Sequence, residues 1–223
     1  MTLRASLIAA LVLLAASTAR AQTDPPLHRL QLGAGVGFFS GATLGDADAN
    51  LRTNSTDPYR LFATSTEQAG TIGLHLHAAI DLTRRFGLEA HTLFARPDVR
   101  TSVTDDVENA PSVDAVERLD QYLIDGGVVI RLHEFRMEGW VPFATAGAGY
   151  LRQLHEGLTL SEHGHLFYFG GGVRRVLMQR PKGLLRGLGA RGDVRLDILS
   201  GGITVEDKRR NQFSASASIF VVF

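Results

Sequence analysis

Three histidines in the first half of the chain have the side-chain type and spacing of transition-metal ligands. His75 and His77 alternate along one predicted strand, and His91 lies with Glu89 on the next one. If a three-residue turn joins these strands, His77 pairs directly with His91 and the three imidazoles meet on one face. Imidazoles ligate Zn²⁺ and Cu²⁺ well, but three histidines among charged neighbours also suit a hydrogen-bond network. We favour the network and predict no bound metal.

Residues 161–165, SEHGH, hold a second group of reactive side chains in a predicted loop. Ser161 and His163 are of the types that form a nucleophile and its general base, with Glu162 and His165 beside them. Nucleophilic catalysis needs hydrogen-bond contact between the serine and the histidine, and an acid that orients the ring. A loop sequence does not show that contact. We favour a solvated loop and predict no catalytic residues.

A Gly-x-Gly-x-Gly run at Gly33, Gly35 and Gly37 resembles part of a dinucleotide-binding loop. That motif needs a strand, a tight turn and then a helix. Here the glycines alternate inside one predicted strand, so we expect them to make room in a crowded interior. The sequence contains no P-loop, paired-cysteine metal site or HExxH motif, and we predict no cofactor.

The side chains discussed above must be positioned by secondary structure, and the last twelve residues, QFSASASIFVVF, give its clearest pattern. Every second residue from Phe213 to Phe223 is apolar, and three serines lie between them, at positions 214, 216 and 218. Strict alternation of this kind is typical of a strand with one apolar and one polar environment. The sequence therefore predicts an amphipathic strand that ends on an aromatic residue.

Seven earlier segments alternate in a similar way and are about as long as a strand that crosses a bilayer at a tilt. With the last one, the predicted strands are residues 29–40, 70–82, 86–95, 119–132, 140–151, 165–178, 188–199 and 212–223. The facing of residues 140–151 stays open because that segment is rich in small residues. Long polar loops are predicted at residues 41–66, 100–117, 152–164 and 201–211, and shorter turns at 83–85, 133–139 and 179–187.

The terminal strand resembles the C-terminal strand of Gram-negative outer-membrane β-barrels, which commonly ends in Phe. The resemblance implies an all-β fold, an eight-stranded antiparallel up-and-down transmembrane β-barrel, with both termini in the periplasm. It also implies contact with outer-membrane lipid and lipopolysaccharide, and recognition of the C-terminal strand by the barrel assembly machinery. We expect a monomer. Aromatic residues should form two girdles. The outer girdle comprises Phe38, Phe39, Phe94, Tyr122, Tyr150, Phe167 and Phe213, and the inner girdle comprises Phe86, Trp140 and Phe223.

The N-terminus reads as a secretory signal peptide. Residues 1–21 combine a basic start at Arg4, an apolar stretch and a small-x-small cleavage site that ends at Ala21. We expect cleavage after Ala21, one barrel domain at residues 22–223, and a location in the cell outer membrane. The signal holds two of the 23 basic residues and none of the 23 acidic ones, which leaves a mature net charge of −2. That balance argues against a nucleic-acid partner.

A soluble barrel of the lipocalin type would show the same alternation with the two faces exchanged. The terminal Phe, the two aromatic girdles and the long loops at one end favour the membrane sense. The predicted lumen then holds paired charges that fill it: Asp81, Glu89, Asp125, Arg131, Arg174, Arg191, Asp193, Arg195 and Asp197. We expect a non-enzymatic outer-membrane protein with a structural or surface-contact role. The alternatives are a lipid-A-modifying enzyme, which some outer-membrane barrels are, and a soluble ligand-binding barrel.

Overall fold

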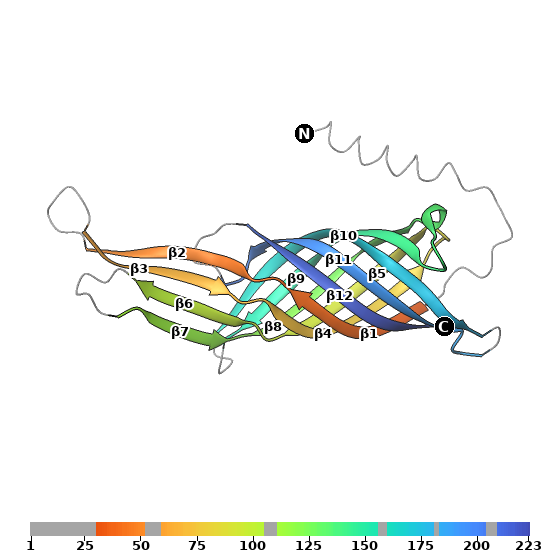
Figure 1. Cartoon of the computed structure of the whole chain (residues 1–223), viewed down its shortest axis with the longest axis horizontal. Helices are drawn as coiled ribbons and strands as arrows, with labels where there is room; N and C mark the ends of the chain where they lie inside the picture. The colour runs from red at the N-terminus through yellow and green to blue at the C-terminus, as the bar shows by residue number, and fades with distance from the viewer. Residues whose placement is uncertain (1–29, 52–58, 105–110, 156–159, 181–182, 204–208) are drawn as a thin grey trace, which may run out of the picture.

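The computed structural model describes residues 30–51, 59–104, 111–155, 160–180, 183–203 and 209–223. Eight antiparallel strands close into a barrel in the order β1-β12-β11-β10-β9-β8-β5-β4 (Figure 1). The barrel strands are β1 (Leu30–Phe39), β4 (Thr71–Asp81), β5 (Phe86–Ala95), β8 (Asp120–Arg131), β9 (Val141–Leu154), β10 (Ser161–Gln179), β11 (Gly187–Gly201) and β12 (Arg210–Val222). The eight-stranded antiparallel barrel is confirmed. The expected signal peptide and its cleavage site lie outside the described residues.

The barrel closes where the first strand meets the last. β1 pairs with β12 from Gln31↔Val222 to Phe39↔Ser214, and β1 pairs with β4 along its other edge. Each barrel strand therefore has two hydrogen-bonded neighbours, and closure leaves no open edge along the barrel wall. In the described part of the chain, no helix is long and apolar enough to cross a membrane.

The barrel has an apolar exterior and a polar interior. Large apolar side chains on the outside are well exposed, among them Ile72 (71%), Val194 (64%) and Ile219 (61%). The alternate positions point inward and are buried, including Glu89, Asp125, Arg131, Arg191, Asp193, Arg195 and Asp197. A soluble barrel has the opposite arrangement, because water solvates charges and not a belt of aliphatic side chains. The sequence predicted apolar side chains on the exterior and charged side chains in the lumen, and the structure confirms this facing.

The structure settles the facing of β9. Ala144, Ala146 and Ala148 alternate with buried positions such as Phe143 and Thr145, so the alanines lie on the exterior. Pairing with β8 and β10 decides this, since the small residues themselves are compatible with either face. β9 and β10 also extend several residues into the predicted loop at 152–164.

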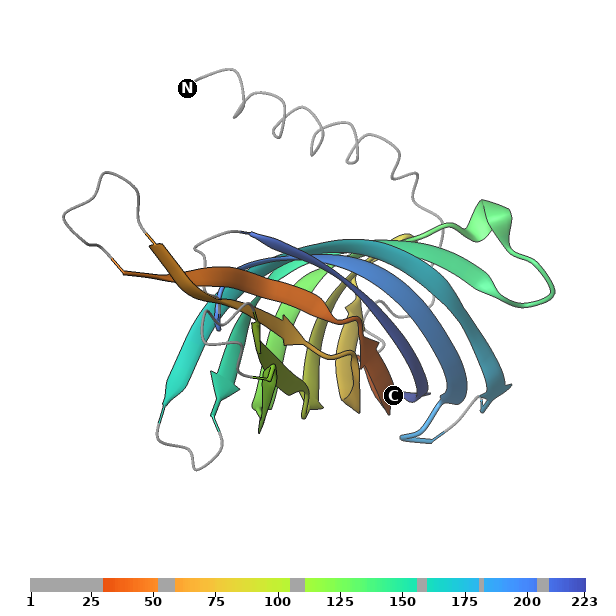
Figure 2. The ribbon, with the colours of Figure 1, turned by 60° about the vertical axis from the view of Figure 1, so that its left-hand side comes forward.

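Two polar segments predicted as loops instead form a sheet beyond one end of the barrel. Its strands are β2 (Ala42–Leu51), β3 (Tyr59–Gln68), β6 (Asp98–Thr104) and β7 (Val113–Arg118), in the order β2-β3-β6-β7. Figure 1 shows this outer sheet projecting from the barrel, and Figure 2 shows it from another side. The prediction was wrong there because residues such as Asp46 and Asn50 are poor strand formers. Pairing between the two hairpins, β3 with β6, stabilises the sheet.

A small apolar cluster joins the outer sheet to the barrel. Leu44, Val99 and Leu119 are buried against one another, and Ile203 packs on them from the β11–β12 connection. At the opposite end, the connections are short, and the one between β8 and β9 contains a single 3-10 turn, η1 (His133–Phe135). The two longest connections, which contain the outer sheet, lie at the expected end. The other two connections at that end were predicted to be long but are short: β9 ends at Leu154 and β10 begins at Ser161, and β11 ends at Gly201 and β12 begins at Arg210.

Gly33 confirms that lumen glycines make room for side chains. A Cβ atom on Gly33 would lie 2.1 Å from Cε1 of His77, which is buried in the lumen. Such a contact is impossible without moving the ring. Gly147 is similar, because its Cβ would lie 2.7 Å from the Tyr168 ring.

The outer aromatic girdle forms with one exception. Phe38, Tyr122, Tyr150, Phe167 and Phe213 are exposed on the exterior, and Phe94 packs on Tyr122 with ring centroids 4.9 Å apart. Phe39 was wrongly placed in the girdle: it follows Phe38 directly, so the alternation turns it into the lumen, where it is 3% exposed. At the other end, Phe86, Trp140 and Phe223 are half-buried.

We predict that Val194→Arg or Ile219→Arg blocks membrane assembly, whereas Ser216→Arg is milder. A cation at the lipid face costs about 2–4 kcal/mol at mid-bilayer. Ser216 faces the lumen and pairs with Asp193, so an arginine there meets a carboxylate. Gel mobility with and without heating measures the folded fraction. Normal assembly of both lipid-face variants would contradict the assigned facing.

Candidate functional site

The lumen gathers most of the buried charge of the described chain, so we treat it as the candidate site. At its inner end, near the short connections, Arg131 forms an ion pair with Asp81, and Gln31 donates to the same carboxylate at 2.9 Å. Arg174 lies over the Phe220 ring, 5.0 Å from its centroid. Each of these contacts joins neighbouring strands or strands with one strand between them, such as β4 with β8 and β10 with β12.

The middle of the lumen holds a continuous network of ion pairs. Arg191 contacts Glu89 at 2.7 Å and Asp193 at 2.9 Å, and Arg195 contacts Asp193 at 3.1 Å and Asp125 at 3.3 Å. All five side chains are nearly fully buried. Buried charges are tolerated only when they are paired and hydrogen-bonded, because desolvation is costly. Each arginine meets two carboxylates, which satisfies that condition.

The three histidines lie together in this network, as their spacing predicted. His77 pairs with His91 across β4 and β5, and His75 Nε2 lies 3.1 Å from His91 Nδ1. His91 also lies 3.3 Å from Glu89 and 3.0 Å from Arg195. The histidines therefore connect the β4–β5 wall to an arginine on β11.

The rings are stacked and do not converge on a common point. Their centroids lie 5.3–5.9 Å apart, with interplanar angles of 13°, 25° and 30°. A chelate needs the ring nitrogens to point at one metal, whereas stacked rings present faces to each other. Within the described residues, no group of three His, Cys, Asp or Glu side chains has the geometry to hold a metal ion. His75 and His91 therefore fit a hydrogen-bond network, and His77 joins them through ring stacking.

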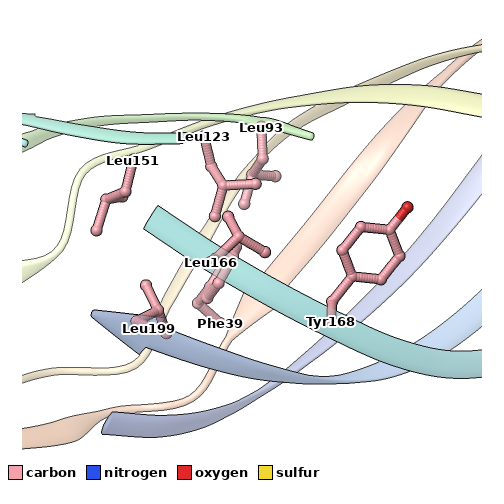
Figure 3. Close-up of a cluster of buried hydrophobic side chains, with 7 residues drawn as sticks. All are labelled: Phe39, Leu93, Leu123, Leu151, Leu166, Tyr168 and Leu199. Atoms are coloured by element: carbon pink, nitrogen blue, oxygen red, sulfur yellow. The ribbon is translucent and has the colours of Figure 1, made fainter. Parts of the chain in front are cut away.

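An apolar layer crosses the lumen between the charge network and the outer sheet. Figure 3 shows its side chains pointing inward from several strands. The layer consists of Phe39, Leu93, Leu123, Leu151, Leu166, Tyr168 and Leu199. Next to it, Gln153 donates to Gln121 at 2.9 Å and Gln68 donates to Gln121 at 3.3 Å, with all three side chains buried. The lumen therefore changes from charged to apolar to amide-lined along its length.

A small cavity of about 30 Å³ lies at the boundary between the charged and apolar layers. Asp197, Ser216 and His75 line it, and each has a buried polar atom without a hydrogen-bond partner among the described residues. A space of this size admits about one water molecule, which needs two to four polar partners. The cavity is too small for a ligand of metabolite size.

The serine–histidine pair predicted in a loop instead lies on β10, at the exposed outer rim. Ser161 Oγ lies 3.1 Å from His163 Nε2, so the contact that a nucleophile needs is present. The other ring nitrogen of His163 contacts the Tyr150 hydroxyl, and no carboxylate contacts this ring among the described residues. Glu162 points to the opposite face of the strand, because adjacent strand residues alternate. The orienting acid of a catalytic triad is therefore not supplied by Glu162.

The sequence reasoning missed the apolar and amide layers of the lumen. Leu93, Leu166 and Leu199 lie on the lumen-facing side of their strands, an even number of residues from lumen-facing polar residues. These apolar residues on the polar face were the sequence signal for the apolar layer. The amide layer also needs Gln68, which belongs to the outer sheet and was predicted to lie between a loop and a strand.

An apolar outer surface around a lumen that holds buried ion pairs decides the class of this barrel. The fold is that of the small eight-stranded outer-membrane barrels. No family model matches the chain, and no curated protein matches its sequence. Among solved structures, the chain is similar to the outer membrane protein OprG from Pseudomonas aeruginosa. That match has 8% identity and a TM-score of 0.49, and it covers 88% of this chain and 96% of OprG.

Two other solved outer-membrane proteins are also similar to this barrel. One is Ail, the attachment invasion locus protein of Yersinia pestis, solved in complex with the heparin analogue sucrose octasulfate, at 12% identity and a TM-score of 0.44, covering 89% of this chain and 100% of Ail. The other is the outer membrane protease OmpT from Escherichia coli, at 10% identity and a TM-score of 0.36, covering 93% of this chain and 100% of OmpT.

We predict that His91→Ala destabilises the barrel more than His77→Ala does. His91 contacts Glu89 and Arg195, and removing a hydrogen bond to a charged group costs about 1.5–3 kcal/mol. His77 stacks with its neighbours, and its Nδ1 atom has no partner among the described residues. Urea unfolding measures the difference, and elemental analysis checks metal content. Stoichiometric zinc that is lost in either variant would support the chelate instead.

Proposed function

We propose that the protein is a non-enzymatic outer-membrane barrel that does not conduct ions and acts at the cell surface through its outer sheet. The succession of paired charges and apolar side chains across the lumen carries this proposal. An ion entering the lumen would have to break ion pairs and then cross an apolar layer without water, and both steps are costly.

The outer sheet supports a role in surface contact. It extends the barrel wall beyond the membrane belt, and β2 and β7 are its two edges. Val113 and Val116 on β7 are 61% and 58% exposed, which places apolar side chains on a strand edge in reach of a partner. A purely structural role in the envelope is compatible with the same barrel, so the experiments below separate the two roles.

The remaining parts of the proposal concern export and assembly. We propose cleavage after Ala21, a monomeric barrel in contact with outer-membrane lipid and lipopolysaccharide, and no nucleic-acid partner. The assembly machinery would recognise the C-terminal strand, where the backbone N–H of Phe223 donates to the Leu30 carbonyl at 2.9 Å. That bond joins the last residue of the chain to the first strand.

One observation favours a second candidate, a lipid-A-modifying enzyme. The Ser161–His163 contact lies on the exterior at the outer rim, where lipid A would be accessible. The ring is held by Tyr150, and no acid contacts it within the described residues, so we place this candidate second.

We predict that the purified mature protein gives no stepwise ion conductance in planar lipid bilayers. The charged and apolar layers both oppose ion entry. A matched variant with Leu93→Ala and Leu123→Ala opens the apolar layer and leaves the ion pairs in place. Stepwise conductance by the unmodified protein would overturn the closed-lumen part of the proposal.

We predict that removing most of the β6–β7 hairpin removes surface contact and leaves the barrel intact. The variant replaces residues 100–117, which include Val113 and Val116, by a short turn and keeps the buried Val99 and Leu119. Heated and unheated gels check folding. Host cells that carry it should resist detergent like the wild type but adhere less to immobilised surface ligands. Normal adhesion would assign the protein the structural role.

We also predict that Ser161→Ala and His163→Ala leave lipid A unchanged, because the pair lacks an orienting acid among the described residues. Mass spectrometry compares lipid A from cells with the intact gene, the variants and no gene. An acyl chain gained or lost only with the unmutated protein would make the enzyme the correct assignment.

A further inference from the structure

The short connections at the inner end of the barrel form one continuous surface, which we call the inner collar. It comprises residues 82–85, 132–140, 175–180 and 183–186 as far as they are described. Arg85 forms an ion pair with Glu134, and the Arg84 carbonyl lies 2.8 Å from His133 Nε2, so the first two segments are in contact. Arg175 lies over the Trp140 ring, 6.0 Å from its centroid, and joins the second segment to the third. Figure 2 shows the connection with η1 standing beyond the barrel wall.

The inner collar is strongly basic. Two glutamates and the C-terminal carboxylate oppose six arginines at this end of the described chain: Arg84, Arg85, Arg136, Arg175, Arg180 and Arg186. Arg136, Arg180 and Arg186 are exposed and have no ionic partner among the described residues. The collar therefore presents uncompensated positive charge to its surroundings.

Apolar side chains are interspersed with these arginines. Phe135, Met137 and Leu184 are 66%, 74% and 79% exposed, among the highest values for large apolar residues in the described chain. They continue the lipid-facing belt, which reaches the collar at Leu82 and Leu177. A basic surface that is continuous with an apolar membrane belt matches the boundary between acyl chains and headgroups.

We propose that the inner collar binds the phosphates of anionic phospholipids in the leaflet at the periplasmic end of the barrel. Guanidinium groups match phosphate oxygens in pairs of hydrogen bonds, and the apolar side chains enter the acyl boundary beside them. Zwitterionic headgroups carry no net charge to balance the collar. The preference is therefore for a net negative headgroup such as phosphatidylglycerol.

The single tryptophan of the chain provides a local probe of this contact. Trp140 lies in the collar beside Arg175, so its fluorescence reports the lipids at that end only. The mature protein is reconstituted in vesicles in which either phosphatidylglycerol or phosphatidylcholine carries brominated chains, at equal mole fractions. Bromine quenches tryptophan on contact, so the ratio of the two quenching curves gives the relative affinity for the two headgroups.

We expect brominated phosphatidylglycerol to be favoured about fivefold over phosphatidylcholine at low salt, with the preference falling in high salt. The variant Arg136→Gln, Arg180→Gln, Arg186→Gln should bring the ratio close to one. A matched control removes three exposed cations outside the collar: Arg100→Gln, Arg152→Gln, Arg209→Gln. It should keep the full preference.

Gel mobility confirms that each variant is folded, since all six substituted side chains are exposed. Equal quenching by the two lipids in the unmodified protein would overturn the proposal and leave the collar for another occupant, such as a periplasmic protein. A preference that survives in the collar variant, or that disappears in the control, would also overturn it.

Discussion

A lipid bilayer offers no hydrogen-bond partner to a peptide group, and the rest of this structure depends on that constraint. A sheet can cross such a medium only if its edges are joined, and here β1 and β12 join them along their length. Closure then imposes a strand tilt and a stagger, which determine the side chains that meet across the lumen. The apolar exterior follows from contact with lipid, and the narrow interior follows from closure of an eight-stranded sheet.

The narrow interior explains how so much charge is accommodated. Small residues and glycines such as Gly33 leave space beside large polar groups, and the arginines of β11 reach carboxylates on β5 and β8. Removing one partner from such a network leaves a buried charge uncompensated, which is more costly than the net stability of the pair. We therefore regard the network as a determinant of one specific strand arrangement as well as a contributor to stability.

The two ends of the barrel differ in chemistry. The outer end continues into a sheet whose strands carry mixed charges and exposed edges, whereas the inner end has short connections rich in arginine and apolar side chains. The two ends of the barrel therefore present different chemistry to their surroundings.

The sequence by itself determined the facing of nearly every barrel strand, because side-chain direction in a strand has a period of two residues. Val194, Ser216 and Ile219 could be assigned to their faces from local alternation, and the short turn at residues 83–85 was enough to pair His77 with His91. Only the tertiary structure decided the contacts that depend on closure and stagger. Arg195 meets His91 although 104 residues separate them, and β3 pairs with β6 although both were predicted as loop. Local pattern specifies which face a side chain occupies, but its partner across the lumen depends on how all eight strands are staggered.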